Sequence, residues 1–140
     1  MNQTKKVLIV DDELPVRYLI RQVLSKEFIV LEARDGKEAL DLARNEQPDI
    51  ILMDLMMPNM DGLTACYAFK KEEPIKRIPI VMVTAIGYDL NKKLAKNVAG
   101  VSAYVTKPFD TQELLNTVKG VLEIQTRELQ NATPIEETIG

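Results

Sequence analysis

The chain has 140 residues, 46% of them hydrophobic and 28% charged, a composition typical of one soluble globular domain. Its net charge of −3 gives no support to nucleic-acid binding, and no apolar run is long enough for a signal peptide or a membrane span. It contains no histidine and a single cysteine, which excludes histidine-based catalysis and an intramolecular disulfide. We therefore predict a cytoplasmic protein without direct contact to nucleic acid or membrane.

Short apolar runs alternate with helical patterns along most of the chain. The apolar runs predict strands at residues 7–10, 28–31, 50–53, 80–83 and 101–105. Apolar residues at helical spacing predict helices over residues 16–24 and 37–45, from about Leu63, over residues 90–98, and from Asp110 onward. Five strand–helix units in strict alternation predict an α/β protein whose parallel sheet carries helices on both faces.

The helical pattern weakens near the end of the chain. The last helix keeps an apolar seam as far as Leu129, and the periodicity is lost from about Asn131. We therefore expect one domain over residues 1–128 and a C-terminal tail or linker over residues 129–140.

Polar residues end several of the predicted strands. Asp11 and Asp12 follow the first strand, and Asp54 follows the third. Thr84 follows the fourth strand and Lys107 the fifth. Because the carboxyl ends of parallel strands form the ligand crevice of such a sheet, these side chains are expected to converge. Three carboxylates repel one another, so we expect a hard cation such as Mg²⁺ between them, with the lysine and the hydroxyl suited to phosphoryl oxygens. The set indicates a phosphoryl site with a carboxylate nucleophile.

Each of these signals is weak when taken singly. Asp11 or Asp12 could simply cap the first helix. A lysine before a proline is usually a solvated strand end, and Thr84 alone is equally well a plain strand terminus. Tyr104 alone is best explained as a packing residue with an exposed hydroxyl. The signals gain weight because all of them end the correct strands in the correct order.

Four stretches of the sequence together resemble the receiver domain of bacterial two-component response regulators, of the chemotaxis-regulator-like kind. The stretches are residues 7–12 (VLIVDD), 54–62 (DLMMPNMDG), 83–85 (VTA) and 104–109 (YVTKPF). The resemblance runs over roughly residues 5–125. It implies a doubly wound five-stranded parallel sheet in the order 2-1-3-4-5 with five helices, a flavodoxin-like three-layer α/β/α sandwich.

The resemblance also implies a role for each candidate site residue. Asp54 would be the phosphoacceptor, and Lys107 would pair with the phosphoryl group. Thr84 would hydrogen-bond the phosphate, and Tyr104 would be the switch aromatic that turns inward when Thr84 moves. Mg²⁺ would be held by the following groups: Asp11, Asp12, Asp54 and the backbone carbonyl of Met56.

The function implied by the resemblance is a phosphorylation switch rather than an enzyme. A sensor histidine kinase or phosphotransfer protein would supply the phosphoryl group, since this chain has no histidine. The only chemistry of its own would be self-phosphorylation and self-dephosphorylation. Phosphorylation would change the surface of the fourth helix, fifth strand and fifth helix. That surface would control a downstream protein or a C-terminal output domain, or form a phosphorylation-dependent homodimer.

Three alternatives remain open from the residues. A Mg²⁺-dependent phosphohydrolase would usually place its nucleophile in an Asp-x-Asp arrangement after the first strand, whereas here the two aspartates are adjacent. A flavin-binding protein would need a hydroxyl-rich loop there, and the loop is acidic instead. A phosphorylation-independent interaction module would often have lost the acidic residues and the lysine.

Overall fold

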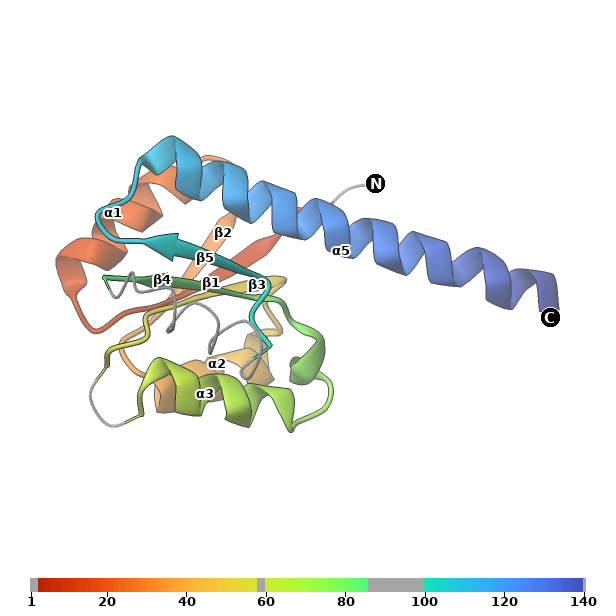
Figure 1. The fold of residues 1–140 in the computed structure, drawn as a ribbon, viewed down its shortest axis with the longest axis horizontal. Coiled ribbons are helices and arrows are strands. Elements are labelled where there is room, and N and C mark those ends of the chain that lie inside the picture. Colours follow the sequence, from red (N-terminus) through yellow and green to blue (C-terminus); the bar gives the residue numbers. More distant parts are fainter. Residues whose placement is uncertain (1–2, 58–59, 86–99, 140) are drawn as a thin grey trace.

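The computed structural model describes residues 3–57, 60–85 and 100–139 of the chain as a twisted sheet between two layers of helices (Figure 1). In chain order the elements are β1 Lys6–Val10, α1 Leu14–Leu24, β2 Ile29–Ala33, α2 Gly36–Glu46, β3 Ile50–Met53, α3 Gly62–Lys70, the short 3₁₀ helix η1 Ile75–Arg77, β4 Ile80–Thr84, β5 Ala103–Thr106 and α5 Thr111–Ile139. The helix predicted over residues 90–98 lies outside the described residues, so the described part contains four α-helices where five were expected.

The sheet is parallel throughout and has the predicted order β2-β1-β3-β4-β5. Val10 at the end of β1 lies opposite Met53 at the end of β3, and the Asp54 N–H donates to the Val10 carbonyl at 2.9 Å. The residues that follow these strands, Asp11 and Asp54, are therefore neighbours at the carboxyl edge. Thr84 pairs with Thr106 at the end of β5, which brings Lys107 to the same edge.

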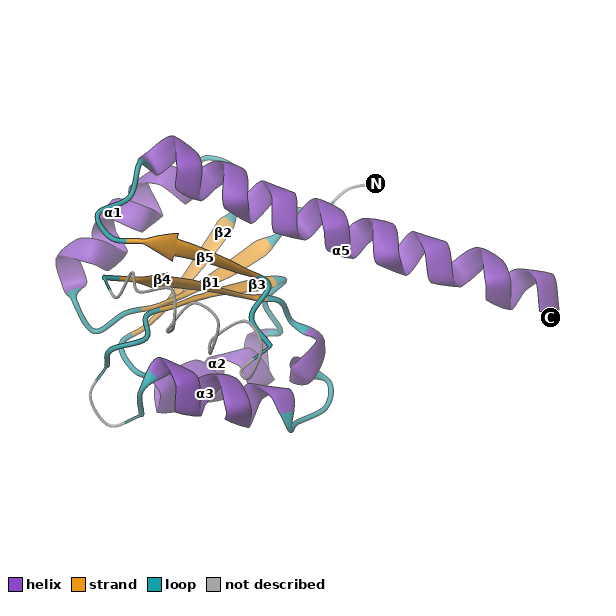
Figure 2. Ribbon diagram, in the orientation of Figure 1, coloured by secondary structure: helices purple, strands orange, loops and turns teal. Residues whose placement is uncertain are grey.

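Two apolar clusters fill the space on either side of the sheet. Leu8 and Val10 belong to the cluster under α2 and α3, whereas Val7 and Ile9 belong to the cluster under α1 and α5. Successive strand residues point to opposite faces, so a strand that is buried on both faces must be apolar throughout. Figure 2 shows the two helical layers with the strands between them, as the three-layer prediction requires.

At the starts of α2 and α3, an aspartate side chain caps the first turn of the helix. The Asp35 side chain accepts the Glu38 N–H at 2.9 Å at the start of α2, and Asp61 accepts the Thr64 N–H at 2.8 Å at the start of α3. The N-cap residue of α1 is instead Glu13, whose side chain makes no capping bond. Neither Asp11 nor Asp12 is thus the N-cap residue of α1.

The helix α5 is longer than the periodicity predicted. We expected the pattern to end at about Asn131, but the helix continues to Ile139 and projects past the end of the sheet (Figure 1). Beyond the sheet there is no core for an apolar stripe to face, so a helix there carries a weak pattern.

Candidate functional site

Carboxylates from two loops meet at the carboxyl edge of the sheet. Within the described residues, the side chains of Asp11, Asp12, Glu13 and Asp54 each place an oxygen within 4.8 Å of the others. Asp11 and Asp54 are only 2% and 5% exposed, whereas Asp12 and Glu13 are exposed. The cluster therefore has a buried floor formed after β1 and β3, and an open rim formed by the loop that leads into α1.

Lys107 extends from the end of β5 into this cluster. Its Nζ lies 2.7 Å from Asp11 Oδ2 and 3.2 Å from Asp54 Oδ2, and it donates a hydrogen bond to each. Glu13 Oε1 is 3.8 Å from the same nitrogen. One ammonium group thus joins the ends of three strands that lie as many as 96 residues apart in the sequence.

Backbone N–H groups hold the second oxygen of each buried carboxylate. The Glu13 N–H donates to Asp11 Oδ1 at 2.9 Å, and the Met56 N–H donates to Asp54 Oδ1 at 3.1 Å. Each buried carboxylate is therefore held between a fixed backbone donor and the Lys107 ammonium, which defines the orientation of both side chains.

The loop after β3 passes very close to the first residue of α3. The Gly62 N–H donates to the Leu55 carbonyl at 2.9 Å. A Cβ atom at Gly62 would lie 2.3 Å from the Asp54 carbonyl oxygen and 2.7 Å from the Leu55 Cα. These are backbone atoms that cannot rotate away, so only glycine allows the loop to approach the helix at this distance.

The charges of the site are unbalanced. Burial raises the pKa of the Asp54 carboxyl, and the negative charge of Asp11 raises it further, although the Met56 N–H and Lys107 act in the opposite direction. Burial tends to lower the pKa of Lys107, but the hydrogen bond and charge of Asp11, with the charge of Asp54, raise it above its usual value. The lysine is therefore charged, and it does not fully compensate the carboxylates.

These residues fit a hard divalent cation. The cluster offers oxygen ligands, and four carboxylates face the single ammonium that the described residues bring to them. Mg²⁺ prefers a few carboxylates together with water and phosphate oxygens, and the exposed rim leaves room for both. Asp11, Asp12 and Asp54 are the predicted side-chain ligands. The predicted Met56 carbonyl belongs to the same loop, two residues beyond Asp54.

The two predicted switch residues lie on the neighbouring strands. Thr84 is the last residue of β4, and its side chain falls outside what the structure describes. Tyr104 lies on β5 opposite Met82, half-buried against the cluster under α2 and α3, and this burial raises the pKa of its hydroxyl.

Glu13 was not among the predicted site residues. The structure places its carboxylate in the cluster and near Lys107. A signal was present, because Glu13 directly follows Asp12 in the same loop, and three consecutive acidic residues after a strand crowd the same edge of the sheet.

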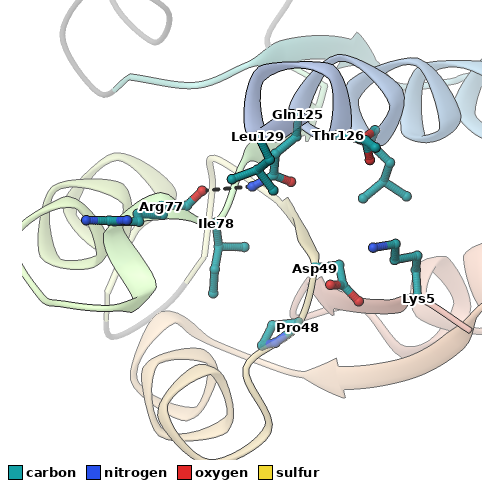
Figure 3. A pocket seen from close by; sticks show the side chains of 9 residues that line it. Lys5, Pro48, Asp49, Arg77, Ile78, Gln125, Thr126 and Leu129 are labelled. Atoms are coloured by element: carbon teal, nitrogen blue, oxygen red, sulfur yellow. Dashed lines mark hydrogen bonds between the residues drawn. The ribbon is translucent and has the colours of Figure 1, made fainter. Parts of the chain in front are cut away.

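A pocket at the opposite edge of the sheet is unsuited to binding a divalent cation. It has a volume of about 150 Å³ and lies beside α5, where Asp49 and Lys5 precede β3 and β1 (Figure 3). The Gln125 amide bridges to the Arg77 carbonyl across it at 3.2 Å. Its lining has one carboxylate and no convergent acidic group, so the carboxyl edge remains the candidate site.

Comparison with known proteins agrees with this fold. The family model described as "Response regulator receiver domain" matches residues 7–119. A "Probable transcriptional regulator ycf27" from Guillardia theta is 40% identical over 119 residues, which cover 84% of this chain and 45% of that protein. The chain thus spans less than half the length of this relative.

Solved structures give the same picture. The chemotaxis protein CheY4 of Vibrio cholerae is 32% identical, with a TM-score of 0.80 over 85% of this chain and 99% of that one. A CheY-like response regulator receiver domain protein from Methanospirillum hungatei JF-1 is 30% identical, with a TM-score of 0.82 over 90% of this chain and 99% of that one. NtrX from Brucella abortus is 25% identical, with a TM-score of 0.83 over 94% of this chain but only 29% of its own.

The fold and the acidic edge define a doubly wound α/β domain with a carboxylate cluster at the carboxyl ends of its strands. The chain belongs to the response regulator receiver domain family. Receiver domains act in two-component signalling as phosphoacceptor switches, and they generally bind Mg²⁺ at an aspartate cluster such as the one described above. Across the described ranges, none of the helices combines the length and apolar character that a membrane crossing needs.

Proposed function

We propose that this chain is a two-component receiver that accepts a phosphoryl group on Asp54 in a Mg²⁺-dependent reaction. The observation that carries the proposal is the contact of Lys107 Nζ with both buried carboxylates, 2.7 Å from Asp11 and 3.2 Å from Asp54. A carboxylate nucleophile, a second acidic group for a cation and a lysine for the phosphoryl oxygens are the parts that this transfer needs.

The transfer forms one bond and breaks one bond. A carboxylate oxygen of Asp54 attacks the phosphorus of a phosphohistidine on a sensor kinase or phosphotransfer protein. The phosphorus–nitrogen bond breaks, its electron pair stays on the imidazole, and an acyl phosphate forms on Asp54. Lys107 can exchange its contact with Asp54 for one with a phosphoryl oxygen, since it keeps Asp11 as a partner.

Mg²⁺ would neutralise the charge that gathers between the phosphoryl oxygens and the carboxylates. Asp11, Asp12 and Asp54 would hold it, together with the Met56 carbonyl. The excess of negative charge at the edge supports this assignment. Glu13, which lies in the same cluster, is exposed and suited to contact through water.

The proposed response is a change of surface. Thr84 would hydrogen-bond the new phosphate, and Tyr104 would turn inward. The surface that includes β5 and α5 would then bind a different partner. The partners we propose are a downstream protein, an output domain that follows the receiver, or a second copy of the chain. We propose residues 1–128 as the receiver, residues 129–140 as a tail or linker, and the cytoplasm as its location.

Acceptance of a phosphoryl group can be measured directly. The protein is incubated with Mg²⁺ and acetyl phosphate, and its intact mass is followed with time. We expect the gain of one phosphoryl group, its removal by hydroxylamine as for an acyl phosphate, and no gain when EDTA replaces Mg²⁺. Sustained turnover of a phosphomonoester would instead favour the phosphohydrolase alternative.

A matched pair of variants identifies the acceptor. Asp54→Asn should gain no phosphoryl group, whereas Asp41→Asn should behave as wild type, because Asp41 is an exposed residue of α2 outside the cluster. Phosphorylation of Asp54→Asn at the wild-type rate would contradict the proposed function.

A further inference from the structure

Arg17 connects the acidic loop to the body of the protein without being one of the acidic residues. It lies on the first turns of α1, and its side chain is only 14% exposed. Its Nη1 donates to the Asp11 backbone carbonyl at 2.7 Å, and its Nε donates to Glu32 Oε1 at 2.9 Å. The guanidinium thus joins the loop after β1 to the strand β2.

The carbonyl that Arg17 holds belongs to the peptide between Asp11 and Asp12. The Asp11 N–H on the other side of the same residue donates to the Ala33 carbonyl at 3.1 Å. The backbone of Asp11 is therefore fixed at both ends. The orientation of the Asp11–Asp12 peptide sets the direction of the backbone at Asp12. It therefore also determines where the Asp12 carboxylate lies.

Glu32 holds Arg17 in place. Its second oxygen accepts a hydrogen bond from Arg21 Nε, and Arg21 also donates to the Val30 carbonyl at 3.2 Å. Partial burial tends to raise the pKa of Glu32, but the hydrogen bonds from Arg21 and Arg17 outweigh it and hold this pKa below its usual value. The carboxylate is therefore ionised at neutral pH, and it anchors a planar guanidinium whose donors point in fixed directions.

We propose that Arg17 is a positioning residue, which holds the Asp11–Asp12 peptide in the orientation that lets both carboxylates bind one divalent cation. The inference rests on the proposed function, because it concerns the same Mg²⁺ site. Groups that orient metal ligands typically affect metal affinity by 10–100-fold, and an exposed ligand such as Asp12 depends most on the direction of its backbone.

Charge alone predicts the opposite effect. Removing the positive charge of Arg17 next to an acidic site would strengthen Mg²⁺ binding, whereas losing the positioning contact weakens it. A lysine at this position keeps the charge but lacks the fork of donors that reaches the Asp11 carbonyl and Glu32 together. Arg21 provides a matched control, because it lies one turn further along α1, shares Glu32 and has no hydrogen bond to the acidic loop.

The test is a calorimetric titration with Mg²⁺ alone, without phosphodonor, on the full chain. We expect Arg17→Gln to weaken Mg²⁺ binding about tenfold, and Arg17→Lys to weaken it more than threefold. Arg21→Gln should stay within threefold of wild type. The melting temperature of each variant, measured in EDTA, shows whether it is folded. If Arg17→Gln does not fold, Arg17→Lys and Glu32→Gln provide the comparison, and both should weaken binding more than threefold.

Each result has a definite meaning. Mg²⁺ binding within threefold of wild type in the folded Arg17 variants would overturn the inference and leave the proposed function standing. Equal weakening by Arg21→Gln would also overturn it, since the effect would then come from α1 or Glu32 in general. Failure of the wild-type protein to bind Mg²⁺ would overturn the proposed function itself, and the inference with it.

Discussion

Replacing Gly62 by alanine tests the close approach between the loop after β3 and the start of α3. The new methyl carbon would lie 2.3 Å from the Asp54 carbonyl oxygen, about 1 Å inside the usual carbon–oxygen contact of roughly 3.3 Å. The loop would have to move, which typically costs about 1–3 kcal/mol, and the Gly62–Leu55 hydrogen bond of about 1 kcal/mol would weaken. The better helix propensity of alanine returns at most about 1 kcal/mol.

We therefore expect Gly62→Ala to lower the free energy of unfolding by about 1–3 kcal/mol, measured by urea denaturation. Gly120→Ala is the matched control, because Gly120 lies within α5 and a Cβ there would meet no atom within 4 Å. This control should raise the free energy of unfolding by about 0.5–1 kcal/mol. Gly62→Ala with the stability of wild type would refute the steric argument.

Three further predictions concern the charges and the buried thiol. In EDTA at pH 7, Asp54→Asn should melt at a higher temperature than wild type. The reason is the raised pKa of Asp54, because the stability that this carboxyl contributes is complete below about pH 4 and is lost as pH rises through the folded-state pKa. An increase in melting temperature that did not shrink as the pH approached 4 would contradict this argument. Lys107→Met should lower the free energy of unfolding by about 3–5 kcal/mol in EDTA, since two buried carboxylates lose the ammonium group between them. Mg²⁺ should raise the melting temperature of this variant more than that of wild type. Burial raises the pKa of Cys66 to about 12, whereas an unfolded thiol titrates near 8.5, so the stability of wild type relative to Cys66→Ala should fall by about 2 kcal/mol between pH 7 and pH 10. A difference that stayed constant over this range would show that the thiol is not desolvated.

The positions of the strand-end residues could be predicted because few arrangements of this chain are possible. Strands that are apolar on both faces must lie inside a parallel sheet, and right-handed connections leave little freedom in their order. Once β1 and β3 are neighbours, Asp11 and Asp54 must meet, and the pairing of Val10 with Met53 places them side by side. The arrival of Lys107 at the same edge follows from the pairing of β4 with β5.

Contacts made by long side chains could not be predicted in this way. The bond from Arg17 to the Asp11 carbonyl depends on side-chain torsions and on the direction of one peptide, neither of which leaves a periodic pattern. The proximity of Glu13 to Lys107 likewise depends on how the loop turns into α1. The length of α5 was underestimated because apolar periodicity reports burial, and a helix that has left the core no longer needs it.

The projecting part of α5 gives the domain a lever arm. A helix of 29 residues is about 44 Å long at 1.5 Å per residue, whereas the five residues of a strand such as β1 span about 17 Å. Its first turn begins only four residues after Lys107, beside the acidic edge. A tilt of about 10° at that end would carry the Ile139 end through roughly 8 Å, so a small repacking beside Lys107 becomes a large displacement where the helix stands clear of the sheet.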